Sequence, residues 1–214
     1  DTGDSSKGKY VILSASGTEL TAETVFHDAT TYTIALKISS DDSYLIAYRD
    51  GDDSNKGKYL INTVAGVEIK AETEFEAGGT YDIAVGEIPS FGYLIAFRDF
   101  GDSSIGKYVV VDFTGTSLVA TTVFNNASSA YISIDTLTND SFVLAYKDVG
   151  DSNKGNFIIS SNISYSAFTV SSAFTVNGIT FDGEDQKFLS KMFNGSAKIT
   201  RIWCDIKNVN NEYN

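Results

Sequence analysis

The chain has 214 residues, a formal net charge of −12 and an apolar share of 42%. This length and balance are those of a folded chain that can bury a core, and they argue against disorder. A surface this acidic repels phosphate groups, which argues against nucleic acid and anionic membranes as partners. The single cysteine, Cys204, excludes an internal disulfide, and no apolar run is long enough for membrane insertion.

A tandem repeat organises the chain. The segment DTGDSSKGKY at residues 1–10 recurs at 50–59, 99–108 and 148–157 as DGDDSNKGKY, DFGDSSIGKY and DVGDSNKGNF, an interval of 49 residues each time. Equal intervals with this much identity indicate duplicated structural units. We therefore predict a single repeat domain, 1–214, with units 1–49, 50–98, 99–147 and 148–214, the last of them divergent as a terminal cap.

Each unit contains four runs that are typical of β-strands. In the first unit these are residues 9–15, 21–27, 31–38 and 43–50, which are rich in Val, Ile, Thr and Tyr and are separated by turn residues. The one helical candidate is 183–193. We predict an all-β chain of four four-stranded units, with about 16 strands in four sheets that break at the DxGDS turns. A small β-propeller is the favoured architecture, and an open stack or solenoid of antiparallel sheets is the alternative.

The unit resembles the blade repeats of β-propellers. Its turn, D-x-G-D-S-[SN]-x-G-x-[YF], is similar to the Asp-box hairpin (S-x-D-x-G-x-x-W) of sialidase-like and lectin propellers, although it lacks the leading Ser and the Trp and has extra residues before the aromatic. The likeness covers about 160 residues. It implies blade architecture, and because the Asp-box is a folding motif in that family, it implies no catalytic role.

The predicted core consists of the apolar members of the repeated runs. They are Val11, Leu13, Phe26, Ile34, Ile46 and Tyr48, with their equivalents in later units.

The repeated turn predicts either a self-capped hairpin or a calcium site. Its first Asp can accept backbone N–H groups as an Asx-turn, and glycines such as Gly101 and Gly106 can take positive φ. Its hard oxygen atoms also have the short spacing that calcium uses, although Lys7, Lys56 and Lys154 would repel a cation. Calcium is the one cofactor that the sequence suggests. The candidate ligands are Asp50, Asp53, Asn55, Asp99, Asp102, Ser104, Asp148, Asp151 and Asn153, with Asp1 and Asp4 in the first unit.

A basic residue ends the last strand of each of the first three units. Strand alternation places this residue on the face opposite to its aromatic neighbour, as with Arg49 beside Tyr48. The base then forms either a structural ion pair or part of one shallow sugar site per unit. The candidate ligand-binding residues are Arg49, Asp50, Asp53, Arg98, Asp99, Asp102, Lys147, Asp148 and Asp151.

No catalytic constellation stands out in the sequence. The one histidine, His27, is replaced by Glu76 and Asn125 in later units, which predicts a surface residue. The many Asp and Glu residues leave one enzymatic alternative open, a pair of carboxylates such as glycosidases use. The prediction is nevertheless that the chain is not an enzyme.

The favoured function is multivalent, lectin-like recognition of glycans or other surface polymers, outside the cell. The alternative is a structural or adhesion subunit that self-associates into a filament or surface layer. The first needs repeated sites and the second needs repeated faces, and a tandem repeat supplies both. Four glycosylation sequons agree with secretion. They begin at Asn126, Asn139, Asn162 and Asn194.

Overall fold

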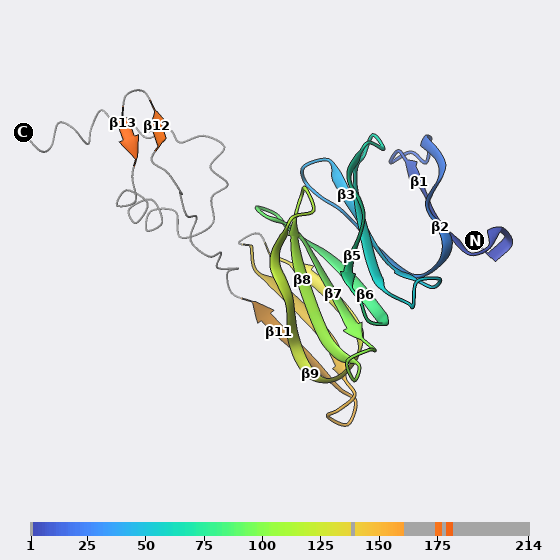
Figure 1. Cartoon of the computed structure of the whole chain (residues 1–214), viewed down its shortest axis with the longest axis vertical. Helices are drawn as coiled ribbons and strands as arrows, with labels where there is room; N and C mark the ends of the chain where they lie inside the picture. The colour runs from blue at the N-terminus through green and yellow to red at the C-terminus, as the bar shows by residue number, and fades with distance from the viewer. Residues whose placement is uncertain (1, 138–139, 161–173, 177–178, 182–214) are drawn as a thin grey trace, which may run out of the picture. The chain divides into compact units, whose positions relative to one another are not determined.

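The computed structural model of the chain describes residues 2–137, 140–160, 174–176 and 179–181. The chain divides into two compact units, Asp1–Ile163 and Ser164–Asn214, which we describe separately. In the second unit, β12 (Phe174–Val176) and β13 (Ile179–Phe181) pair as an antiparallel hairpin (Figure 1). In the described part of the chain, no helix has the length and apolar character of a membrane span.

The first unit is built from β-strands, preceded by a short 3-10 turn at Thr2–Asp4. The strands are β1 (Lys7–Leu13), β2 (Glu19–Ile38), β3 (Ser43–Asp50), β4 (Gly57–Thr63), β5 (Glu68–Glu76), β6 (Thr80–Ile88), β7 (Gly92–Asp99), β8 (Ile105–Asp112), β9 (Ser117–Thr136), β10 (Phe142–Asp148) and β11 (Lys154–Ser160). They form a five-stranded sheet of order β1-β2-β3-β4-β5 and a six-stranded sheet of order β11-β10-β9-β8-β7-β6. Every pairing is antiparallel between consecutive strands, so each sheet is a meander. The all-β prediction is confirmed.

The predicted four-stranded units are wrong as sheet boundaries. Both β2 and β9 run for 20 residues and change partner on the way: β2 pairs with β1 up to Thr30 and with β3 from Thr31. In the middle unit the same run is split into β5 and β6 at residues 77–79, which include Gly78 and Gly79. Glycine has no side chain to pack in a strand, so a glycine pair weakens it. The boundary between the two sheets lies at this break.

The DxGDS turns do not break the sheets. They join β3 to β4, β7 to β8 and β10 to β11, and the flanking residues pair directly, as Arg49 does with Gly57. The sequence motif therefore marks hairpins inside a sheet. A closed four-bladed ring is not seen among the described strands.

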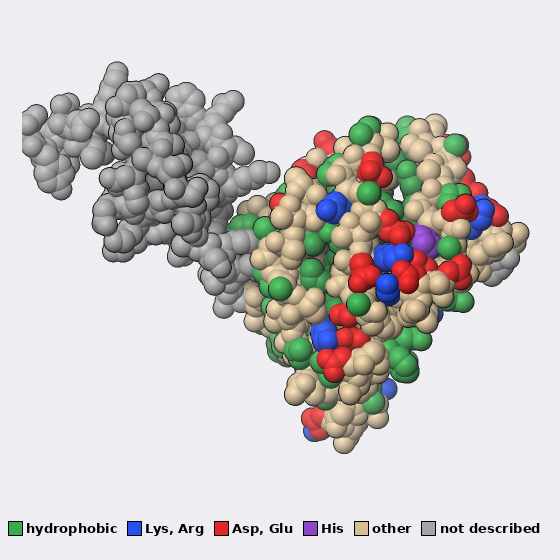
Figure 2. All heavy atoms as spheres, in the orientation of Figure 1, with side chains coloured by type: hydrophobic (Ala, Val, Ile, Leu, Met, Phe, Trp, Pro, Cys, Tyr) green, Lys and Arg blue, Asp and Glu red, His purple; other side chains and the backbone are tan. Residues whose placement is uncertain are grey.

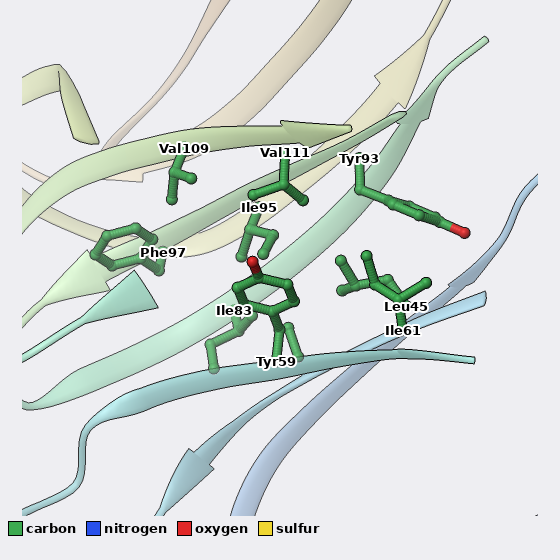
Figure 3. Close-up of a cluster of buried hydrophobic side chains, with 10 residues drawn as sticks. Leu45, Tyr59, Ile61, Ile83, Tyr93, Ile95, Phe97, Val109 and Val111 are labelled. Atoms are coloured by element: carbon green, nitrogen blue, oxygen red, sulfur yellow. The ribbon is translucent and has the colours of Figure 1, made fainter. Parts of the chain in front are cut away.

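The core consists of three clusters, one between the two sheets and one among the strands of each single sheet. The central cluster joins β3 and β4 of one sheet to β6, β7 and β8 of the other (Figure 3). Its buried members are Leu45, Ala47, Tyr59, Ile61, Ile83, Tyr93, Ile95, Phe97, Val109 and Val111. The second cluster uses the opposite face of β7 and β8, packed against β10, and the third packs β1 and part of β2 on the opposite face of β3 and β4. Strands β3 and β7 are thus buried on both faces, as their continuous apolar runs require.

The core prediction is confirmed in part. Ile46 and Tyr48 are 1% and 0% exposed, and Phe26 packs against them partly buried. The prediction that Val11, Leu13 and Ile34 are buried was wrong, because these side chains are 47%, 53% and 52% exposed. Val109 and Val111, the equivalents of Val11 and Leu13 in the third unit, are buried because β4 of the other sheet packs against them, whereas no other strand of the first unit packs on this side of β1. The predicted helix at 183–193, Cys204 and three of the sequons lie outside the described residues.

Candidate functional site

The repeated turns are self-capped hairpins. Asp50 Oδ1 accepts the backbone N–H groups of Asp52 and Asp53 at 3.0 and 3.2 Å. The equivalent Asp99 and Asp148 each accept one N–H, from Asp102 and Asp151, both at 3.1 Å. The Asx-turn interpretation is therefore confirmed.

Positive φ in these turns belongs to Ser and Asn rather than to glycine. The residues are Ser5, Ser6, Ser54, Asn55, Ser103, Ser104, Ser152 and Asn153. The expectation for Gly101 and Gly106 was wrong. Gly106 is needed for space instead, because a Cβ there would lie 2.3 Å from the ring of Phe124. A Cβ on Gly8 or on Gly57 would lie 2.5 Å from the ring of the equivalent phenylalanine, Phe26 or Phe75.

A lysine ammonium occupies the middle of the second turn. Lys58 Nζ lies 2.7 Å from Asp50 Oδ2, 2.9 Å from Glu72 Oε1 and 3.3 Å from Asp53 Oδ2. Partial burial opposes its charge, but the hydrogen bonds to Asp50 and Glu72 outweigh this and raise the pKa of Lys58. The ammonium therefore stands where a calcium ion would need to bind these carboxylates.

The same arrangement recurs in the neighbouring units. Lys107 Nζ lies 2.7 Å from Asp99 and 2.9 Å from Asp102, and Lys9 Nζ lies 2.8 Å from Asp4. The sequence analysis considered Lys7, Lys56 and Lys154. It missed the lysine of the G-K-Y triplet, which is Lys9, Lys58 or Lys107, although this triplet repeats in three turns. In the fourth turn Asn156 replaces it, and the calcium hypothesis stays a prediction.

The other predicted calcium ligands anchor the turns through their backbone. The carbonyl oxygens of Asn55 and Ser104 accept the N–H groups of Thr80 and Ser129, each at 2.9 Å. In the fourth turn, Asp151 pairs at the surface with Lys154, 2.9 Å away. The carbonyl contacts of Asn55 and Ser104 fix the second and third turns against the next part of the repeat.

His27 is enclosed by acidic and basic side chains, which Figure 2 shows around the purple histidine. Its Nδ1 lies 2.8 Å from Glu72 Oε2, and its Nε2 lies 3.3 Å from Asp50 Oδ1 without the alignment of a hydrogen bond. The Tyr48 hydroxyl donates a short hydrogen bond to the same Glu72 oxygen. The imidazole is 10% exposed, so the prediction of a surface histidine was wrong.

The chemistry of this cluster is that of ionised, paired groups. Burial alone would raise the pKa values of Asp50 and Glu72, but hydrogen bonds hold both below the ordinary range: those from Lys58 and the Asp52 N–H to Asp50, and those from Tyr48 and Lys58 to Glu72. All of these hydrogen bonds favour the ionised form of the two carboxylates. His27, Asp50 and Glu72 offer ligand atoms within 4.8 Å of one another, the spacing of a metal site, but Lys58 already bonds both carboxylates.

A β-bulge repeats beside these turns. The register of β2 with β3 shifts between Tyr32 and Ala35, and that of β6 with β7 shifts between Tyr81 and Ala84. The residue after each tyrosine has positive φ, 44° at Thr33 and 47° at Asp82; in β9 the equivalent residue is Tyr131, at 52°. A bulge twists its strand and redirects side chains.

The bulges place tyrosine rings against the predicted basic residues. The Arg49 guanidinium carbon lies 4.4 Å from the Tyr32 ring centroid and 4.2 Å from that of Tyr81. The Arg98 guanidinium carbon lies 5.1 Å from the centroid of the Tyr81 ring, and its Nε lies 3.1 Å from Asp82 Oδ2. We call Tyr32, Arg49, Tyr81 and Arg98 the cation–aromatic row.

The row agrees with the predicted alternation of the strands. Tyr48 and Phe97 are fully buried, while Arg49 and Arg98 are partly exposed on the other face. The structure brings both arginines to one tyrosine, and Lys147 Nζ lies 5.6 Å from the ring of Tyr131 in the next unit. The tyrosines were missed, although the T-Y-x-I-A run repeats in two units.

Comparisons with known proteins gave little. No family model and no curated protein matches the sequence. Among solved structures the chain is similar to one described as "Crystal structure of putative exo-beta-1,3-galactanase from Bifidobacterium bifidum s17", with 14% identity and a TM-score of 0.43. The match covers 77% of this chain and 59% of that chain. At this level it transfers neither residues nor activity.

The prediction that the chain is not an enzyme is contradicted by this comparison, because the similar structure is described as that of an enzyme. That prediction considered residues close together in sequence or shared by the repeats. Folding brings His27 to Asp50 and Glu72, from positions far apart in the chain.

Proposed function

We propose that the chain recognises glycans through the cation–aromatic row, outside the cell. The observation that carries the proposal is Arg49, whose guanidinium lies between the rings of Tyr32 and Tyr81. Tyrosine rings offer flat apolar surfaces for the faces of sugar rings. A guanidinium offers several donors in a fixed plane for hydroxyl and carboxylate oxygens. Both kinds of contact are thus presented side by side.

The charge of Arg49 supports a ligand that carries acceptors. Among the described residues, no carboxylate lies within ion-pair distance of its guanidinium, although the chain carries a net charge of −12. Stacking holds the side chain in place without neutralising it. Glycans with acidic groups should therefore bind more tightly than neutral ones.

Repetition supports multivalent binding. The row spans two units, and in a third unit Lys147 lies over the ring of Tyr131, one position further along the strand than Tyr32 and Tyr81. Several weak sites on one rigid body strengthen binding to a clustered ligand without any new contact. A single sugar is expected to bind weakly, and a polyvalent display of the same sugar tightly.

We further propose that the sheets form an open stack. The support is the succession of three clusters, in which β3 and β7 are each buried on both faces. Stacking of the sheets brings Arg49 of one sheet to Tyr81 of the other, so the row depends on it.

A glycan array with neutral and acidic members, probed with the whole chain, tests the proposal. Arg49→Lys keeps the charge but loses the planar stacking, and Tyr81→Ala removes the ring that both arginines share. Each should weaken binding to the best clustered glycan at least about tenfold. Lys37→Gln is the matched control, since it removes a cation from β2 outside the row.

The same samples should be assayed for release of free sugar, which separates recognition from turnover. The glycan proposal is rejected by an array without signal, or by row variants that bind as well as the Lys37→Gln control.

A further inference from the structure

Two apolar patches lie exposed at opposite ends of the stacked strands. We call Val11 and Leu13 on β1 the first end face, and Phe157 and Ile159 on β11 the second end face. Val11 and Leu13 are 47% and 53% exposed, and Phe157 and Ile159 are 67% and 60% exposed. Adjacent exposed apolar side chains of this size on a soluble chain indicate an interaction surface.

The two end faces are the halves of an interface that already exists inside the molecule. In the central cluster, Tyr59 and Ile61 on β4 pack with Val109 and Val111 on β8 (Figure 3). Two repeat lengths forward from Tyr59 and Ile61 stand Phe157 and Ile159, and two repeat lengths back from Val109 and Val111 stand Val11 and Leu13.

Burial of these equivalent positions shows what the end faces lack. Tyr59 and Ile61 are 3% and 0% exposed, and Val109 and Val111 are 5% and 2% exposed. The side chains at the ends have the same chemical character and the same strand positions. They differ in having no other sheet of the first unit packed on them.

The strand beside the second end face shows the same difference in burial. Ala145 on β10 is exposed, whereas its equivalents Ala47 and Ala96 are both 0% exposed in the clusters. The second end face therefore presents two neighbouring strands, β10 and β11, in the pairing that β3 and β4 use inside the molecule.

We propose that the second end face of one copy of this chain packs on the first end face of another, head to tail. One copy exposes both faces at once with the other strands of the stack between them, so a second copy can cover them without unpacking the core. The interface continues the stacking seen in the three clusters within the chain. Because the two faces are different, the contact is heterologous, and repetition leads to a ring or a filament.

Two charged substitutions test the proposal on the whole chain, without any glycan. Phe157→Lys blocks the second end face, and Val11→Lys blocks the first. Light scattering coupled to size exclusion should show concentration-dependent oligomers for the unsubstituted chain and monomers for each variant. Val67→Lys is the matched control, since Val67 is 62% exposed outside both faces. It should assemble like the unsubstituted chain.

Mixing the two variants gives the decisive result. The Val11→Lys copy keeps its second end face and the Phe157→Lys copy keeps its first, so together they should form a 1:1 dimer that grows no further. Far-UV circular dichroism confirms folding, with Ile159→Lys as the replacement if Phe157→Lys does not fold. An unsubstituted chain that is monomeric at every concentration overturns the proposal, as does a mixture that stays monomeric or single variants that still assemble.

Discussion

Asp50 shows how one side chain organises a turn. It is 2% exposed, its Oδ1 caps two backbone N–H groups and its Oδ2 receives the Lys58 ammonium. A buried carboxylate is tolerated when its hydrogen bonds are satisfied, and all of these contacts favour its ionised form. The turn and the polar cluster around His27 therefore share this residue.

Replacing Asp50 by Asn should destabilise the fold by about 1.5–3 kcal/mol, because it removes a charged hydrogen bond and leaves Lys58 with fewer partners. Asp151→Asn is the control, since its pair with Lys154 is more than half exposed on both sides and should contribute little. Urea unfolding at neutral pH measures both. Equal losses in the two variants would show that burial of Asp50 does not matter.

The stability of the fold should depend on pH through the ionisation of Asp50 and Glu72. The pKa values of Asp50 and Glu72 are lowered from 3.8 and 4.5, so their contribution is complete above the ordinary values and is lost as the pH falls through the lowered ones. The free energy of unfolding should therefore drop below about pH 4. The drop should be smaller in Asp50→Asn, as urea titrations across this range would show.

At the scale of the element, the repeated G-K-Y triplet combines a steric and an electrostatic role. The glycine lies against a phenylalanine ring from β2, β5 or β9, and the lysine reaches the carboxylates of the turn. In the first three units, these contacts tie the first strand to the second and to the turn before it. The triplet thus holds a hairpin in register.

Gly57→Ala should cost about 1–3 kcal/mol, because its Cβ would lie 2.5 Å from the Phe75 ring. Gly155→Ala is the matched control: it occupies the equivalent position on β11, and nothing lies within 4 Å of a Cβ there. Thermal unfolding followed by circular dichroism compares the two. Similar melting temperatures would show that the ring moves aside at no cost.

The whole molecule is held by faces that pack between sheets. Phe97 on β7 is 0% exposed and lies in the central cluster, where its ring centroid is 5.0 Å from that of Phe75. Because strands such as β7 have both faces covered, loss of one large side chain weakens contact between sheets rather than within one.

Phe97→Ala should therefore cost about 3–5 kcal/mol. Phe100→Ala provides the comparison, since Phe100 is three residues away in the same part of the chain and is 61% exposed. Its removal should cost much less. Denaturant unfolding gives both values, and a loss below about 1 kcal/mol for Phe97→Ala would contradict the packing described here.

The repeat, the strand-forming runs and the capping role of the turn Asp residues were predictable from the sequence. These features depend on residues close together in the chain, where period-two alternation and Asx chemistry act locally. The sheet boundary was not predicted, because three units share the same pattern of runs and the glycine pair at Gly78 and Gly79, which interrupts the strand in the middle unit, was not considered. Because the repeats share one pattern, the sequence does not show which copy has a face that no other sheet covers.

The sequence by itself determined that this is a repeated all-β chain with arginines placed opposite buried aromatics. The tertiary structure alone decided that His27 is enclosed beside Asp50 and Glu72, that Arg49 lies between two tyrosines, and that Val11 is exposed where Val109 is buried. Each of these depends on contacts between residues far apart in the chain. Such contacts are set by which sheet faces meet, and local sequence patterns do not encode that choice.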